Sequence, residues 1–255
     1  MLARNMKITN LSLEVGDIAS TARFFRQRLG LPATIGNGVA IIEIGCTRIE
    51  LKEGNDREGV HHLAITIPTN KFAGAKRWLK KRVALLKHDG ADEFETAPSW
   101  NARSLYFDGP DGSILELIVR RDLENATDGP FSSNDLLGVS EVGVMVPDVR
   151  TVAAMLESDA LIPPYGWIPF NDFAPVGDVE GLLILVGANR PWFPTVDRVS
   201  SASPIEIDAL GERSGEYSLG PASRLRVSAA PAGSGGLQSP VSRAARFSAN
   251  PDVLN

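Results

Sequence analysis

The sequence contains very little cysteine, which excludes two kinds of site. Cys46 is the one cysteine among 255 residues, so the chain has neither a disulfide framework nor a cysteine-based zinc cluster. Lys and Arg number 26 against 31 Asp and Glu, and no run of basic residues forms a stripe that would bind a nucleic-acid backbone. We therefore expect no nucleic-acid partner.

Long apolar stretches and several familiar catalytic motifs are also absent. No segment approaches the roughly 20 apolar residues of a membrane span, and the first residues lack the apolar core of a secretion signal. We therefore expect a cytoplasmic protein without a membrane partner. The chain has no GxSxG elbow, no P-loop and no glycine-rich dinucleotide motif between a strand and a helix. Because 43% of its residues are hydrophobic, it can bury a core.

An approximate internal repeat is the most informative feature of the sequence. Three alternating strands, at residues 8–17, 60–68 and 139–148, are each followed by an amphipathic helix, at residues 18–29, 71–85 and 150–157. Pairs of further strands follow each helix, at residues 39–44 and 47–52, 103–107 and 113–119, and 173–176 and 181–186. The repeated unit is therefore βαβββ, clear twice and looser a third time.

These units divide the chain into four segments and predict an α+β protein. Residues 7–120 hold the two clear units, and the polar residues 121–136 form a linker. Residues 137–228 hold the third unit, extended by short strands at residues 204–209, 216–219 and 224–228. Residues 229–255 are rich in Ala, Ser, Gly and Pro and predict a flexible tail.

Strand parity singles out three ionisable residues. Successive side chains of a strand point to opposite faces, and in each unit one face is apolar and must be covered by the helix. His62, Glu50 and Glu116 fall on the other face. An ionisable group on an interior strand is costly unless it is paired, hydrated or bound to a metal, so these three are candidate site residues.

Two motifs in the clear units resemble a known family. Asn10, Leu13, Val15 and Asp17, followed by FFRQRLGL at residues 24–31, resemble the opening of a vicinal oxygen chelate module. The segment YFDGPDGSILEL at residues 106–117 resembles the closing hairpin of that module. This superfamily includes glyoxalase I, extradiol dioxygenases, fosfomycin resistance proteins and bleomycin-binding proteins. The resemblance covers residues 7–120 clearly and residues 137–195 more weakly.

The resemblance implies a fold. In this superfamily, pairs of βαβββ modules close into cup-shaped mixed sheets with the helices outside. We therefore expect units one and two to form the functional cup, and unit three with its extra strands to form a half-cup. An odd number of units leaves one edge or face unpaired, so unit three would pair with its own extra strands or with a second chain in a homodimer.

The resemblance also implies a metal site, because the ligands come from the first and last strands of each module. The matching positions are Asn10, Glu50, His62 and Glu116. A glyoxalase-like set of His, Glu, His and Glu is kept except at Asn10, whereas the two-His-one-carboxylate triad of extradiol dioxygenases is broken there. Glu50, His62 and Glu116 would hold a divalent Mn, Fe, Ni or Zn ion, and either Glu could act as a catalytic acid or base. Glu141 has the equivalent first-strand position in unit three, but without a carboxylate near residues 183–185 we do not expect it to form a second full site.

Other interpretations of the same residues stay open. Asn10, Trp100 and Arg103 are predicted to contact a substrate. His62 taken alone favours a buried structural histidine, and only its place beside Glu50 and Glu116 makes it an equally good candidate ligand. The two glutamates are also compatible with salt bridges to Arg48, Lys52 or Arg103, and His61 has the parity of a structural residue. The leading hypothesis is a metal-dependent lyase, isomerase or dioxygenase acting on a small oxygenated molecule. The alternative is a metal-free protein that binds a small molecule, as bleomycin resistance proteins do.

Overall fold

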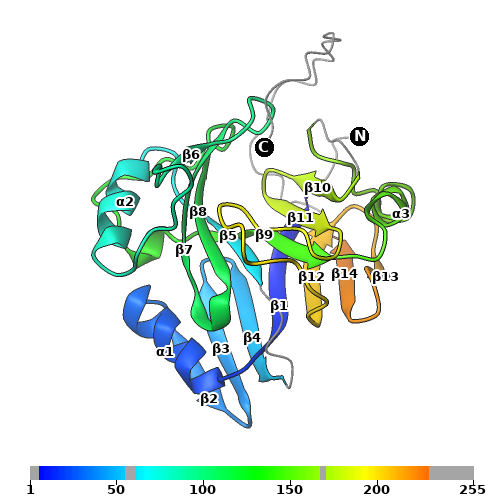
Figure 1. The fold of residues 1–255 in the computed structure, drawn as a ribbon, viewed down its shortest axis with the longest axis horizontal. Helices are drawn as coiled ribbons and strands as arrows, with labels where there is room; N and C mark the ends of the chain where they lie inside the picture. Colours follow the sequence, from blue (N-terminus) through cyan, green and yellow to red (C-terminus); the bar gives the residue numbers. More distant parts are fainter. Residues whose placement is uncertain (1–5, 55–60, 167–170, 230–255) are drawn as a thin grey trace.

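The computed structural model describes residues 6–54, 61–166 and 171–229 (Figure 1). Within these residues the strands form two sheets of seven strands each, and both sheets contain parallel and antiparallel pairs. The predicted α+β class, with curled mixed sheets, is confirmed. From residue 230 onward, the predicted tail lies outside the described residues.

Four related units make up the sheets. The first comprises β1 (Lys7–Val15), α1 (Ile18–Arg28), β2 (Ala33–Gly36), β3 (Val39–Ile44) and β4 (Thr47–Glu53). The second comprises β5 (His62–Thr66), α2 (Phe72–Lys80), β6 (Phe94–Glu95), β7 (Ala102–Asp108) and β8 (Ile114–Arg120). The third comprises β9 (Gly138–Met145), α3 (Val149–Met155), β10 (Phe173–Asp178) and β11 (Gly181–Val186). The fourth comprises β12 (Ile205–Gly211), β13 (Gly215–Ser218) and β14 (Ser223–Ala229).

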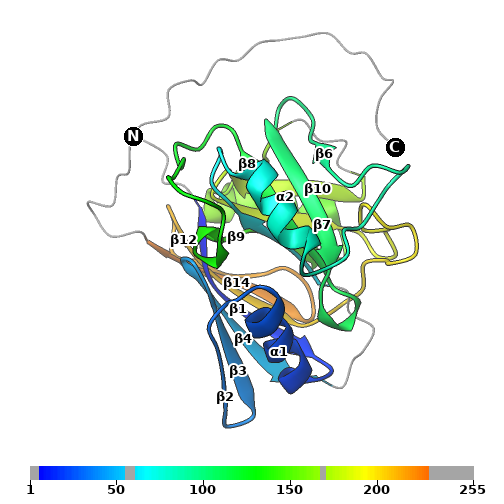
Figure 2. The same cartoon turned by 90° about the vertical axis from the view of Figure 1, so that its left-hand side faces the viewer.

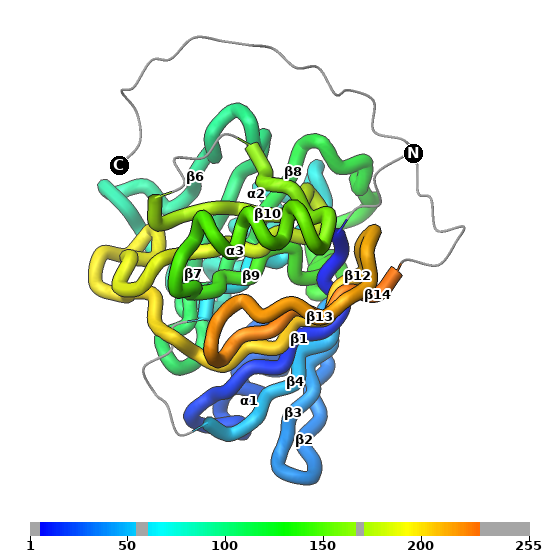
Figure 3. Tube along the Cα trace, turned by 90° about the vertical axis from the view of Figure 1, so that its right-hand side faces the viewer, coloured from blue at the N-terminus to red at the C-terminus, as the bar shows by residue number. Residues whose placement is uncertain are grey.

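The pairing of the units corrects the expectation from the sequence. Sheet A, with strand order β13-β14-β12-β1-β4-β3-β2, joins the first unit to the fourth, and sheet B, with order β10-β11-β9-β5-β8-β7-β6, joins the second to the third. In each sheet the first strand of one unit pairs antiparallel with the first strand of the other, β1 with β12 and β5 with β9. Figure 3 shows the orange C-terminal strands beside the blue β1. Units one and two therefore do not share a cup.

The reason lies in the C-terminal strands. They were expected to extend unit three, but they form a unit of their own and pair with β1, which leaves β5 to pair with β9. Each of the four first strands is thus paired within the chain. The argument for a second chain, which rested on an odd number of units, no longer applies.

The helices cover the sheets on their outer sides. In Figure 2, α1 lies over sheet A and α2 over sheet B. The Asp17 side chain accepts a hydrogen bond from the Ser20 N–H at 2.9 Å and so caps the start of α1. Helix α2 ends at Lys80, five residues before the predicted end, because the Leu86 N–H donates to the Tyr106 carbonyl and ties the chain to β7. No helix of the described residues is long and apolar enough to cross a membrane.

Buried hydrogen bonds join the two sheets. The Thr47 hydroxyl donates to the Ile8 carbonyl at 3.0 Å and accepts from the Val139 N–H at 2.9 Å. Nearby, the Cys46 N–H donates to the Leu137 carbonyl at 3.0 Å. One hydrophobic core contains side chains of both sheets. The sheets are therefore packed as one body.

The predicted linker, residues 121–136, is anchored at its end. The Lys71 ammonium lies 2.6 Å from the Asp135 carboxylate, and both side chains are more than nine-tenths buried. The second Asp135 oxygen accepts from the Ser132 N–H at 2.8 Å. Burial would raise the pKa of Asp135, but its bonds to Lys71 and Ser132 lower it. The linker is thus held against the start of α2.

Candidate functional site

Strand β5 and its two neighbours in sheet B bring three buried ionisable side chains together. Ala64 of β5 lies opposite Glu116 of β8 on one side and opposite Glu141 of β9 on the other. His62 is two residues before Ala64 and points to the same face. The exposed fractions of His62, Glu116 and Glu141 are 6%, 1% and 3%, so this group (the His–Glu–Glu cluster) lies in the interior.

The donor atoms of the cluster have spacings that suit one ion. The His62 Nε2 is 3.6 Å from the Glu116 Oε2 and 4.0 Å from the Glu141 Oε2, and one donor atom from each residue lies within 4.8 Å of the others. Both His62 separations exceed a normal hydrogen bond. Two atoms that each bind a metal at about 2.1 Å can be up to about 4.2 Å apart. The cluster can therefore accept a divalent ion after small movements of its side chains.

Arg120 completes the cluster from the end of β8. Its side chain is fully buried, and its Nη2 forms an ion pair with the Glu141 Oε1. Because this bond uses Oε1, the Oε2 of Glu141 still faces His62. Metal-binding carboxylates commonly hold such an outer partner, which fixes their orientation. Arg120 is thus compatible with a metal ion on the other oxygen.

Burial and mutual charge set the protonation of the cluster. Burial and the negative charge of Glu141 raise the pKa of Glu116 to about 7. Burial would also raise the pKa of Glu141, but the charges of Arg120 and His62 lower it below its usual value. Burial would lower the pKa of His62, yet the two carboxylates raise it. Near neutral pH, Glu141 is therefore ionised, and Glu116 can exchange a proton.

Aromatic side chains cover the cluster. The Trp192 ring lies 5.4 Å from the His62 ring between centroids, and the Tyr106 ring lies 6.3 Å away on a nearly parallel plane. A Cβ on Gly143 would come within 2.5 Å of the Trp192 ring, so glycine at this position lets the indole lie flat against β9. Burial and the nearby carboxylates raise the pKa of Tyr106 well above its usual value, so its hydroxyl stays protonated.

Several buried polar atoms around the cluster lack a hydrogen-bond partner among the described residues. They are His62 Nδ1, Thr66 Oγ1, Ser104 Oγ, Arg120 Nε and Nη1, Ser140 Oγ and Trp192 Nε1. Such atoms are rare in folded proteins because each costs free energy. Their concentration on sheet B indicates a place for a ligand with polar groups.

The structure brings together only part of the site expected from the sequence. His62 and Glu116 meet, but Glu50 lies on β4 of sheet A, half-exposed, with its carboxylate 3.6 Å from the Lys52 ammonium. Asn10 is also on sheet A, where its Nδ2 lies 3.4 Å from the Asp208 carboxylate. The expectation that Glu50 and Asn10 join His62 is thereby corrected, because their unit pairs with the fourth unit and not with the second.

The other two predicted substrate contacts have different surroundings. Trp100 packs against the apolar cluster that contains Trp192, and its ring lies 5.7 Å from that of Tyr165. It is therefore on the side of the sheet where the His–Glu–Glu cluster lies. Arg103 points to the opposite face, where its guanidinium stacks over Phe72 and pairs with Glu93 at 2.5 Å. Arg103 therefore does not face the His–Glu–Glu cluster, and its contact with a substrate stays a prediction.

Sequence reasoning missed Glu141, Arg120 and Trp192. The sequence did contain a signal for Arg120, because it lies four residues after Glu116 on β8 and therefore faces the same side of the sheet. Glu141 was recognised as a first-strand position but set aside, since a partner was sought within its own unit. Its partners come from β5 and β8 of another unit.

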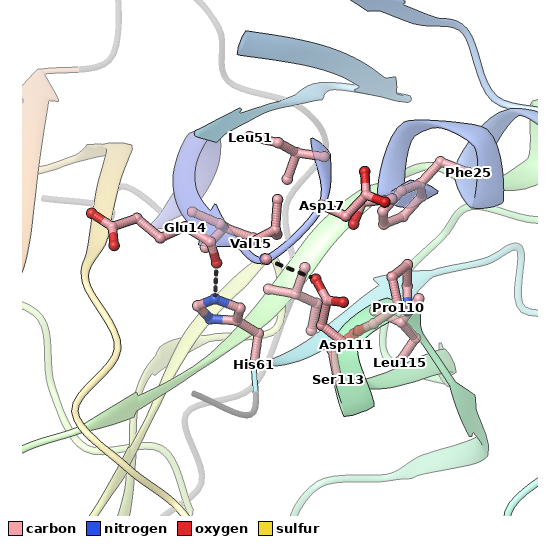
Figure 4. Close-up of a pocket in the computed structure, with 14 residues that line it drawn as sticks. Glu14, Val15, Asp17, Phe25, Leu51, His61, Pro110, Asp111, Ser113 and Leu115 are labelled. Carbon is pink, nitrogen blue, oxygen red and sulfur yellow. Dashed lines mark hydrogen bonds between the residues drawn. The ribbon is translucent and has the colours of Figure 1, made fainter. Parts of the chain in front are cut away.

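His61 points to the other face of β5 and lines a separate cavity of about 310 Å³. Its Nε2 donates to the Glu14 carbonyl at 3.0 Å (Figure 4). On the other side of the cavity, the Asp111 carboxylate accepts from the Gly16 N–H at 3.1 Å. Burial lowers the pKa of His61, so the ring is neutral. The first bond ties the end of β1 to the residue before β5, and the second ties it to the turn between β7 and β8, in agreement with a structural role for His61.

Comparisons with known proteins agree with this architecture. No protein-family model and no curated protein matches the chain. A proposed dioxygenase from Bacillus subtilis has a similar structure, with a TM-score of 0.53 over 81% of this chain and 71% of that one, at 17% identity. A variant of glyoxalase I from Zea mays has a TM-score of 0.50 over 80% of this chain and 74% of that one, at 16% identity. The chain therefore shares the fold of these two structures.

Proposed function

We propose that His62, Glu116 and Glu141 hold a divalent metal ion and that the protein is an enzyme acting on a small oxygenated molecule. The observation that carries the proposal is the cluster itself, in which three buried donor residues point their ligand atoms to one place. One imidazole and two carboxylates suit Mn, Fe, Ni or Zn. Two proteins with this fold are a proposed dioxygenase and a glyoxalase I, which agrees with chemistry of this class.

The residues of the cluster have separate tasks in this proposal. A bound metal ion would supply Lewis acidity, which polarises substrate oxygen atoms. Arg120 holds one oxygen of Glu141 and keeps the other directed at His62. Glu116, whose pKa in the metal-free protein is about 7, would accept or release a proton at neutral pH when it is not coordinated to the ion. Trp192 and Tyr106 exclude water from His62. A proton-transfer reaction of the lyase or isomerase kind is favoured over ring cleavage because the cluster has one imidazole, whereas the triad of extradiol dioxygenases has two.

Metal content tests the proposal and separates the cluster from the ligand set expected from the sequence. Protein purified without chelator, or reconstituted with Mn²⁺, Fe²⁺, Ni²⁺ or Zn²⁺, is measured by elemental mass spectrometry. We expect near-stoichiometric metal in the native protein and loss of metal in His62→Gln and Glu141→Gln. His61→Gln and Glu50→Gln are the matched controls, because each changes the same residue type outside the cluster, and both should keep the metal.

A metal-free binding protein is the second candidate, and the charges of the cluster favour it. Arg120 and a protonated His62 balance the charges of Glu116 and Glu141 without any ion. Absence of metal from the native protein after all four reconstitutions would refute the enzyme proposal and support this candidate. Retention of metal in Glu141→Gln but not in Glu50→Gln would instead return the site to the set expected from the sequence.

A further inference from the structure

Arg120 has unused hydrogen-bonding capacity in the interior of the protein. Its side chain is fully buried, and only its Nη2 has a partner, Glu141. Its Nε and Nη1 lack a hydrogen-bond partner among the described residues. An arginine side chain stays charged and can only donate hydrogen bonds. Two unsatisfied donor atoms on a buried cation are costly, so the group that completes them must offer acceptor oxygens.

Two hydroxyl groups on the same face of sheet B lie close to Arg120. Ser104 of β7 and Thr66 of β5 both lie opposite Ile118, two residues before Arg120 on β8. Diagonal neighbours such as Ser104 and Arg120 are separated by about 7–8 Å between Cα atoms, within the reach of an arginine side chain. Both hydroxyls are buried and have no hydrogen-bond partner within 3.5 Å in the described part of the chain, although Ser104 lies close enough to Glu116 to lower its pKa. Each can donate a hydrogen bond to the same ligand.

Small apolar side chains are the neighbours of Arg120 on this face of the sheet. Ala64 and Ala102 form a small buried cluster with Ile118, and Ala102 lies directly opposite Arg120. Methyl groups at these positions do not compete for the free N–H groups of Arg120. Glu116 lies two residues before Ile118 on the same face. The donor groups of Arg120, Ser104 and Thr66 are therefore next to the His–Glu–Glu cluster.

The net charge that the cluster would have with a bound metal ion also favours a negatively charged ligand. A divalent cation on two carboxylates and a neutral His62 would be balanced, and the charge of Arg120 would then remain in excess. A buried excess charge needs a counter-charge. A ligand with one negative charge would satisfy both this excess and the spare donors.

We infer that the substrate is a small organic carboxylate with an oxygen on the neighbouring carbon, and that Arg120 binds its carboxylate with help from Ser104 and Thr66. The inference rests on the proposed function for the neighbouring oxygen, which would face His62 and Glu116. It does not need the metal for the carboxylate itself, because the donors belong to the chain. Arg120 acts here as a recognition residue.

Binding of a matched pair of compounds tests the inference. Pyruvate and pyruvamide have the same shape and the same vicinal oxygen atoms, but only pyruvate carries a charge. Their dissociation constants are measured by calorimetry at constant ionic strength, with inorganic phosphate as a third probe. We expect the native protein to bind pyruvate at least tenfold more tightly than pyruvamide or phosphate. In Arg120→Gln, which can still donate to Glu141, the preference for pyruvate over pyruvamide should fall below twofold.

The controls keep the result decisive. Arg103→Gln removes a guanidinium from the opposite face of the sheet and should leave the preference unchanged. If circular dichroism shows that Arg120→Gln is unfolded, Arg120→Lys replaces it, and a tenfold weaker affinity for pyruvate is expected. Equal binding of pyruvate and pyruvamide, preference for phosphate, no binding of any probe, or an unchanged preference in the Arg120 variant that folds would overturn the inference.

Metal-loaded and chelator-treated protein are compared throughout. A pyruvate preference that depends on Arg120 in a protein that binds no metal would support the inference and refute the proposed function. Normal metal content without a pyruvate preference would refute the inference and leave the proposed function supported. The two failures are therefore distinguishable.

Discussion

Replacing Glu116 by Gln should change the pH dependence of stability in the metal-free protein. Burial and the charge of Glu141 raise the pKa of Glu116 from 4.5 to about 7 in the folded state. The unfolded chain releases this proton near pH 4.5, while the folded protein keeps it until about pH 7. The free energy of unfolding therefore falls as the pH rises through this window. Gln has the same shape and does not ionise, so its variant lacks this fall.

The expected fall in the free energy of unfolding follows from the difference between the folded-state and unfolded-state pKa values of Glu116. About 7 minus 4.5 is about 2.5, and each pH unit of difference corresponds to about 1.4 kcal/mol, which gives roughly 3 kcal/mol. The penalty is absent below pH 4.5 and complete above about pH 7. Because Glu116 and Glu141 interact strongly, the measured value belongs to the pair.

Urea unfolding of chelator-treated protein between pH 5 and pH 8 measures this effect. Other buried groups contribute to both proteins. Burial raises the pKa of Asp178 to about 6, which also lowers stability as the pH rises, and burial lowers the pKa of His61, which acts in the opposite direction. The difference between the native protein and Glu116→Gln removes these shared contributions. Parallel stability curves, or a native protein that gains stability over the variant as the pH rises, would refute the electrostatic argument.

Three further variants test how the fold supports the site. Asp135→Ala leaves the buried Lys71 ammonium without its partner and should lower the free energy of unfolding by about 3–5 kcal/mol in urea; a loss below 1 kcal/mol would show that water replaces Asp135. Thr47→Val removes two buried hydrogen bonds, one within sheet A and one between the sheets, and should cost about 2–4 kcal/mol, whereas an unchanged urea midpoint would contradict this role. Gly143→Ala places a Cβ against the Trp192 ring and should cost about 1–3 kcal/mol and shift the tryptophan emission to the red. An unshifted spectrum would mean that the indole does not cover β9 as described.

The local elements were predictable because short-range patterns specify them. Strands β3 and β11 have the predicted bounds, since a short, mostly apolar run and nearby glycines mark both. The face of His62 and Glu116 followed from the period of two along a strand. Helix α2 was predicted too long because its end depends on a bond between Leu86 and β7, a contact distant in sequence.

The composition of the site was not predictable from these patterns. Glu50, His62 and Glu116 have similar parity and similar neighbours in sequence, yet only two of them meet. Glu141 was set aside because its own unit supplies no carboxylate partner. Its partners come from β5 and β8 through the pairing of β5 with β9.

The sequence by itself determined the repeated βαβββ unit, the inward-facing positions of His62 and Glu116, and the likeness to vicinal oxygen chelate modules. Only the tertiary structure decided which unit lies beside which, and thereby replaced Glu50 with Glu141 and added Arg120. The physical reason is that parity and propensity act within one strand or helix, whereas a cluster forms between strands. Each first strand offers similar hydrogen-bonding groups to any other first strand, so the choice of partner depends on the packing of the whole chain.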